Sequence, residues 1–68
     1  MASGFVKAIV DSGRFGFIAA AGSERDYFFH ERDLVGIEWD QTLQAMRVEF
    51  DMVSSDRGPR AACVRAAR

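Results

Sequence analysis

The 68-residue sequence contains one cysteine, one proline and one histidine, and these shortages exclude several classes of protein. Because Cys63 is alone, neither an internal disulfide framework nor a cysteine-based zinc site can form. No apolar run approaches the ~20 residues that span a bilayer. The N-terminus also lacks the charged and apolar segments of a signal peptide. We therefore expect a soluble, reduced, cytoplasmic protein that makes no membrane contact.

The same shortages argue against an enzyme. His30 and Cys63 lie on different predicted strands, which disfavours a nucleophilic pair, and Cys63 is expected to pack as a small apolar side chain. In an extended strand, Glu31 would point away from His30, which disfavours a metal site. We predict no catalytic residue, no metal and no cofactor.

The residues that are present favour a single small folded domain over residues 1–68. Hydrophobic residues make up 49% of the chain and charged residues 28%, which is unlike a disordered sequence. A chain of this length has a thin core. The net charge of −1 is low for a nucleic-acid-binding protein, but the charge is unevenly spread. Acidic residues concentrate in 31–56, whereas 57–68 contain arginines and no acidic residue.

Apolar residues recur with a period near two along most of the chain, which predicts strands. The expected strands span residues 4–11, 15–20, 26–30, 47–53 and 60–65. Five short strands separated by turns indicate a small all-β barrel or sandwich, with a short helical turn inside the long connection 31–45. Ala61 and Val64 have opposite parity, which predicts a bulge in the last strand. The predicted core comprises Val6, Ile18, Phe29, Val48, Phe50 and Val64.

Alternating side chains place aromatic residues together on the second and third strands. If Ile18 and Phe29 point inward, the outward side chains are Phe15, Phe17, Phe28 and His30. Parity alone equally allows the reverse arrangement, but Gly16 offers no side chain to a core and favours the first one. Exposed rings usually mark a binding site, and unpaired bases stack on such rings for ~1–3 kcal/mol each.

These residues resemble the motifs of a known family. Phe15-Gly16-Phe17-Ile18 followed by Asp26-Tyr27-Phe28-Phe29-His30 is similar to the two RNA-binding motifs of bacterial cold-shock proteins and eukaryotic Y-box domains. Gly4-x-Val6-Lys7 resembles their opening strand, and residues 57–64 resemble their closing motif. The resemblance covers essentially the whole chain and implies a five-stranded antiparallel OB-fold barrel. It also implies binding of single-stranded RNA or DNA, in the role of an RNA chaperone.

The resemblance assigns nucleic-acid-binding roles position by position. Stacking positions match Phe15, Phe17, Phe28 and His30, and basic contacts match Lys7 and Arg57. Asp26 matches an acidic residue that accepts a hydrogen bond from a base edge. Weaker matches add Ile9, Arg14, Trp39 and Arg60.

The sequence also departs from the family pattern. Ala8-Ile9 replaces Trp-Phe, Gly13-Arg14 replaces Lys-Gly, and Glu31 replaces an aromatic residue. The loss of two stacking positions should weaken nucleic-acid binding by roughly 2–6 kcal/mol. The Arg14 guanidinium can itself stack on a base and offset part of this loss. With so few basic residues near the face, we expect about two to four phosphate contacts.

These losses leave a second hypothesis open. A degenerate barrel with weak nucleic-acid binding could act as a protein-interaction or self-association module through Trp39, Ile9 and the phenylalanines. Nucleic-acid binding is favoured because a pure interaction module has no reason to retain Lys7, the aromatic residues and Arg57 together. We expect a monomer, with a dimer as the alternative.

Overall fold

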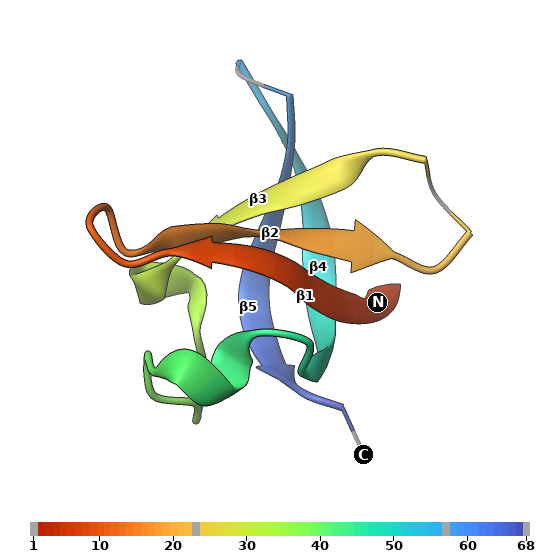
Figure 1. Cartoon of the computed structure of the whole chain (residues 1–68). Helices are drawn as coiled ribbons and strands as arrows, with labels where there is room; N and C mark the ends of the chain where they lie inside the picture. The colour runs from red at the N-terminus through yellow and green to blue at the C-terminus, as the bar shows by residue number, and fades with distance from the viewer. Residues whose placement is uncertain (1, 23, 57, 68) are drawn as a thin grey trace.

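The computed structural model describes residues 2–22, 24–56 and 58–67 and contains five strands in this part of the chain. The strands are β1 (Ala2–Val10), β2 (Phe15–Ala20), β3 (Asp26–His30), β4 (Arg47–Ser55) and β5 (Gly58–Ala66) (Figure 1). Two short 3-10 helices, η1 (Glu31–Asp33) and η2 (Gln41–Leu43), lie in the long connection between β3 and β4. The predicted strands and helical turn are confirmed. Within the described residues, no helix has the length and apolar character needed to cross a membrane.

The strands close into a barrel in the order β1-β2-β3-β5-β4. β1, β2 and β3 form an antiparallel meander, β4 and β5 form a hairpin, and β1 also pairs antiparallel with β4. The remaining pair, β3 with β5, is parallel and joins Phe28 to Arg60. The barrel therefore differs from a fully antiparallel one at this single pair. A closed ring with an odd number of strands cannot alternate in direction throughout.

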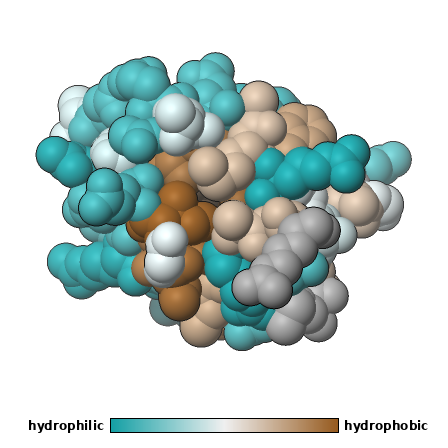
Figure 2. Space-filling view, turned by 90° about the horizontal axis from the view of Figure 1, so that it is seen from below, coloured by the Kyte–Doolittle hydropathy of each residue, from teal (hydrophilic) through white to brown (hydrophobic). Residues whose placement is uncertain are grey.

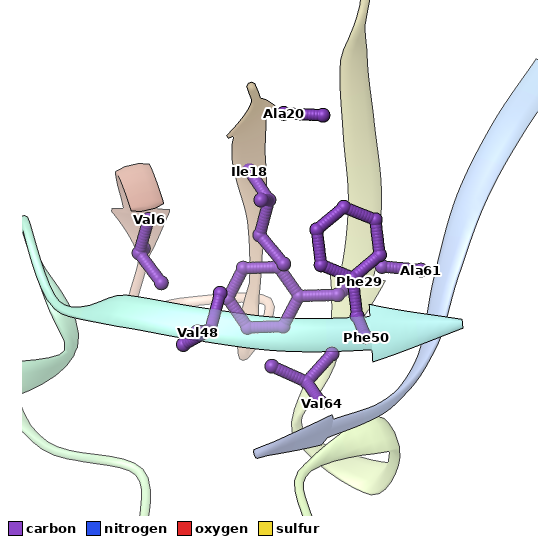
Figure 3. Packing of buried hydrophobic residues seen from close by; sticks show 8 residues of the cluster. All are labelled: Val6, Ile18, Ala20, Phe29, Val48, Phe50, Ala61 and Val64. Carbon is purple, nitrogen blue, oxygen red and sulfur yellow. The ribbon is translucent and has the colours of Figure 1, made fainter. Parts of the chain in front are cut away.

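The interior is filled by the residues that the sequence predicts. Val6, Ile18, Phe29, Val48, Phe50 and Val64 are all fully buried, together with Leu43 and Ala61. Figure 3 shows the rings of Phe29 and Phe50 at the centre, with the aliphatic side chains around them. Burial of one such side chain contributes about 1.5–3 kcal/mol, so these few residues dominate the stability of a thin core.

The predicted bulge in the last strand is confirmed, but the predicted packing of Cys63 is wrong. The register between β4 and β5 shifts between Glu49 and Asp51, opposite the segment that contains Cys63. Cys63 has a φ of 52°, in the left-handed region that favours glycine, and its side chain is exposed. The extra residue turns the thiol outward and lets Ala61 and Val64 both face the core.

The connection between η1 and η2 covers the lower end of the barrel. Leu34, Ile37 and Trp39 pack against the core, whereas Val35 is 52% exposed. Figure 2 views the molecule from below and shows hydrophobic residues gathered on this side, with hydrophilic residues around them. Trp39 Nε1 donates a 3.1 Å hydrogen bond to Asp11 Oδ1, which fastens the connection to the turn after β1.

Candidate nucleic-acid interface

The outer surface of β2 and β3 carries a cluster of rings that we call the aromatic face. Its members are Phe15, Phe17, Phe28 and His30. The register pairs Phe15 with His30 and Phe17 with Phe28. All four side chains are half-buried, whereas Ile18 and Phe29 on the opposite side of the same strands are fully buried. The sequence-based parity assignment is therefore confirmed.

The three phenylalanine rings form a compact triangle. The ring centroids of Phe15 and Phe28 are 5.5 Å apart with a tilt of 31°. Phe17 meets Phe15 at 6.0 Å and Phe28 at 6.1 Å, in both cases edge to face. Such pairs are worth about 0.5–1.5 kcal/mol each, so the rings hold one another in position on an open surface.

Gly16 is required where β2 passes over the core. A Cβ atom at this position would lie 2.5 Å from the Ala8 carbonyl oxygen and 2.9 Å from the ring of Phe29. The absence of a side chain lets the buried Phe29 ring approach the strand from inside. The sequence indicated that Gly16 offers no side chain to the core, and these close contacts give the steric reason.

β1 extends the aromatic face with small apolar side chains. Its register shifts at Lys7, after which Ala8 pairs with Phe17 and Val10 pairs with Phe15. Directly paired residues share a face of the sheet, so Ala8 and Val10 border the rings. Ile9 pairs with Gly16 and packs against the core. The opposite parity of Val6 and Ile9 in the sequence could have indicated this bulge.

Ion pairs border both ends of the aromatic face. At one end, Lys7 Nζ lies 3.1 Å from Asp26 Oδ2. Asp26 precedes Phe28 by two residues and therefore shares its side of β3. At the other end, Arg14 Nη1 lies 2.9 Å from Glu31 Oε2, and the Glu31 amide donates to the Arg14 carbonyl at 2.8 Å.

A third ion pair lies on the side toward β5. Arg60 Nη2 donates to both carboxylate oxygens of Asp33 at 3.2 Å. Asp33 is only 12% exposed and also accepts a 2.8 Å hydrogen bond from the His30 amide. Arg60 therefore helps to hold the end of β3 in place.

His30 is oriented by the start of η1. Its Nδ1 accepts a 3.3 Å hydrogen bond from the Arg32 amide, and Asp33 accepts from the His30 amide in return. An Nδ1 that accepts a hydrogen bond carries no proton, so the neutral ring carries its proton on Nε2. In this arrangement His30 offers a hydrogen-bond donor as well as a ring surface.

A cleft of about 520 Å³ adjoins the aromatic face toward the β4–β5 loop. Its lining combines the rings of Phe17 and Phe28 with Pro59 and the polar side chains of Ser55, Asp56 and Arg60. Arg57, a predicted phosphate contact, lies outside the described residues.

Trp39, in the connection between η1 and η2, is partly buried against the core. Its ring centroid lies 6.2 Å from that of the buried Phe29, and its indole nitrogen is bound to Asp11. Among the described residues, no three His, Cys, Asp or Glu side chains gather closely enough to hold a metal ion.

A closed five-stranded barrel with this strand order defines a domain of the OB type. The model of the cold-shock DNA-binding domain matches residues 2–67. A curated protein described as a cold shock-like protein from Aquifex aeolicus (strain VF5) is 40% identical over 63 residues, covering 91% of this chain and 89% of the relative. The chain belongs to the cold-shock domain family, whose members bind single-stranded nucleic acids.

A structural comparison agrees with the fold. A solved structure described as Drosophila Unr CSD456 superposes with a TM-score of 0.77 at 19% sequence identity. The superposition covers 98% of this chain and 26% of that chain. At this level of identity the likeness concerns the barrel alone.

Proposed function

We propose that this domain binds single-stranded RNA or DNA by stacking unpaired bases on the aromatic face. The observation that carries the proposal is the half-exposed triangle of Phe15, Phe17 and Phe28, which the core does not require. Every base has an aromatic surface, so stacking of this kind tolerates many sequences. A duplex hides those surfaces, so the proposed site discriminates against paired strands.

The side chains around the rings have supporting roles in this proposal. Lys7 and Arg14 can each contact a phosphate once the ion pair with its carboxylate partner opens. His30 donates from Nε2 to a base carbonyl or phosphate, and Asp26 accepts from the amino edge of a base. Arg60 binds Asp33 and lines the cleft beside Phe17 and Phe28, where it is a further proposed phosphate contact.

A binding titration tests this function. Fluorescence anisotropy of an end-labelled oligothymidine should show saturable binding, and a labelled duplex of the same length should bind far more weakly. The label is placed on the oligonucleotide because Trp39 packs beside Phe29 and is bound to Asp11, so its fluorescence would also respond to changes in this packing. Equal affinity for both probes, or binding of neither, would contradict the proposal.

The cellular role that we propose is that of a cytoplasmic RNA chaperone. A site that binds only unpaired bases shifts the equilibrium of a weak hairpin toward its open form. Addition of the protein to a hairpin with a fluorophore and a quencher at its ends should therefore raise the fluorescence. A stable hairpin of the same length is the control and should stay closed.

The alternative is a protein-interaction or self-association module. Two of the side chains that it would use, Ile9 and Trp39, pack against this domain's own core. Among the large apolar side chains that remain exposed, Phe5 is 48% accessible and pairs with Ala19 of β2. We expect a monomer, and sedimentation velocity over a range of concentrations distinguishes it from a dimer.

A further inference from the structure

The cations at the two ends of the aromatic face are neutralised without being buried. Lys7 and Arg14 side chains are 58% and 56% exposed, and each is nevertheless bound by a carboxylate of the same chain. The partners are Asp26 and Glu31. A ligand can therefore reach both cations, but neither offers an unopposed positive charge.

A phosphate that contacts Lys7 or Arg14 has to compete with a carboxylate. Exposed ion pairs are weak, so this exchange of partners is accessible. The exchange frees a carboxylate beside the incoming phosphate chain, where the two negative charges attract a cation from solution. That uptake offsets the counterion release which makes ordinary nucleic-acid binding dependent on salt.

We propose that Asp26 and Glu31 act as intramolecular counterions, so that the aromatic face recognises unpaired bases and gains little from the phosphate chain. This inference rests on the proposed single-strand binding and specifies which part of the strand is recognised. The net charge of −1 is consistent with it, because the domain as a whole does not attract a polyanion. The number of effective phosphate contacts is then lower than the two to four that the sequence alone predicts.

The salt dependence of oligothymidine binding tests this inference. One unopposed phosphate contact to a single strand gives a slope of about −0.7 in a plot of log K against log salt concentration. We expect the wild-type slope to be shallower than about −1.4, the value for two such contacts. An oligothymidine with an uncharged methylphosphonate backbone should also bind nearly as tightly as the natural one.

Removing both carboxylates should restore the salt dependence of ordinary nucleic-acid binding. In the double variant Asp26→Asn/Glu31→Gln, both cations are unopposed, and the slope should steepen by about −1.4. Between about 50 and 200 mM salt, the variant should lose about sevenfold more affinity than the wild type. The slope is the readout, because Asp26 is itself a proposed base contact and its loss changes the affinity at every salt concentration.

A matched control separates this effect from net charge. Glu38→Gln/Asp51→Asn removes two exposed carboxylates outside the described ion pairs and should leave the slope unchanged. The inference is overturned if the wild-type slope is steeper than about −1.4, or if the double variant behaves like this control. Single-strand binding with a steep slope overturns this inference alone. Failure of all variants to bind any oligothymidine overturns the proposed function as well.

Discussion

Phe28 and Phe29 are adjacent in the sequence, yet Phe28 lies in the outer ring triangle and Phe29 is fully buried in the barrel. Successive residues of a strand point to opposite faces of the sheet, so Phe29 belongs to the core and Phe28 to the proposed binding surface. Substituting each of them in turn tests the assignment of both faces.

Phe28→Ala and Phe17→Ala should each weaken oligothymidine binding by ~1–3 kcal/mol. Their effect on thermal unfolding should be smaller than that of a core substitution, because both rings are half-buried on the outside of the barrel. Phe29→Ala, the control, should instead unfold much of the protein. Anisotropy titration and circular dichroism of the same samples check both quantities. An unfolded Phe28→Ala protein whose folded fraction binds normally would contradict the assignment.

Phe50→Ala should cost ~3–5 kcal/mol of folding free energy, because it opens a cavity among fully buried side chains. A core of this size rarely supplies more than ~3–5 kcal/mol in total, so the variant should be largely unfolded at room temperature. Phe5→Ala removes the same ring from an exposed position and should leave the protein folded. Urea titration followed by circular dichroism distinguishes the two. A cooperative, near-wild-type transition for Phe50→Ala would refute the described core.

Ala8→Trp should strengthen oligothymidine binding by the free energy of one additional stacked base, ~1–3 kcal/mol. Ala8 pairs with Phe17 across β1 and β2, so the new indole would stand beside the existing rings. The slope of log K against log salt should not change, since no phosphate contact is added. Ser3→Trp places an indole on the same strand, opposite Glu49 of β4, and should not alter the affinity. Equal affinities for Ala8→Trp and the wild type would show that the ligand does not reach β1.

Gly16→Ala should destabilise the fold by about 1–3 kcal/mol, the usual cost of overpacking. The added methyl group meets a backbone carbonyl of β1 and the buried Phe29 ring, neither of which can move freely. Gly13→Ala is the comparison, because its methyl group meets only the ring of Phe15, which can turn aside. Thermal unfolding should separate the two variants clearly. A Gly16→Ala protein as stable as Gly13→Ala would refute the close approach.

Asp40 should contribute stability that depends on pH. The Thr42 hydroxyl, and to a smaller degree the Thr42 amide, donate hydrogen bonds to the Asp40 carboxylate and lower its pKa below the usual value. The folded pKa is thus below the unfolded one. The stabilisation is therefore present above the ordinary carboxyl pKa of about 4 and is lost as the pH falls through the folded pKa.

Asp40→Asn removes this dependence while keeping a side-chain acceptor at the start of η2. We expect the wild type to be more stable than Asp40→Asn at pH 7 and the difference to shrink as the solution is made strongly acidic. Denaturant unfolding at a series of pH values checks this. A difference that is constant with pH would show that the charge of Asp40 does not contribute.

The sequence predicted the elements whose cause is local. Alternation located the strands, and the parity of Phe29 against Phe28 assigned the faces correctly, because a strand's period is fixed by its own backbone. The bulge at Cys63 followed from Ala61 and Val64 both being apolar. The predicted packing of the Cys63 thiol was wrong, because the alternation of apolar residues does not reveal the left-handed backbone conformation at the bulge.

Contacts between residues far apart in the sequence could not be predicted from the alternation along each strand. The ion pairs of Lys7 with Asp26 and of Arg14 with Glu31 depend on strand register and on the bulge in β1, which bring distant side chains together. Trp39 was only a weaker match to the family pattern, and its position against Phe29 depends on the path of the whole connection. Glu31 was identified from the sequence only as the replacement of an aromatic residue, and its ion pair with Arg14 was not predicted.

The order of strands in the barrel has a consequence for folding kinetics. The aromatic face belongs to the β1–β2–β3 meander, whose pairings join strands that are consecutive in the chain. The two pairings that close the barrel, such as Ala2 with Phe50 and Phe28 with Arg60, join residues far apart in sequence. Such contacts require loop-closure entropy to be lost first and slow the folding of small barrels to milliseconds or longer. We therefore expect the rings to meet early during folding, before the core that fixes them is complete.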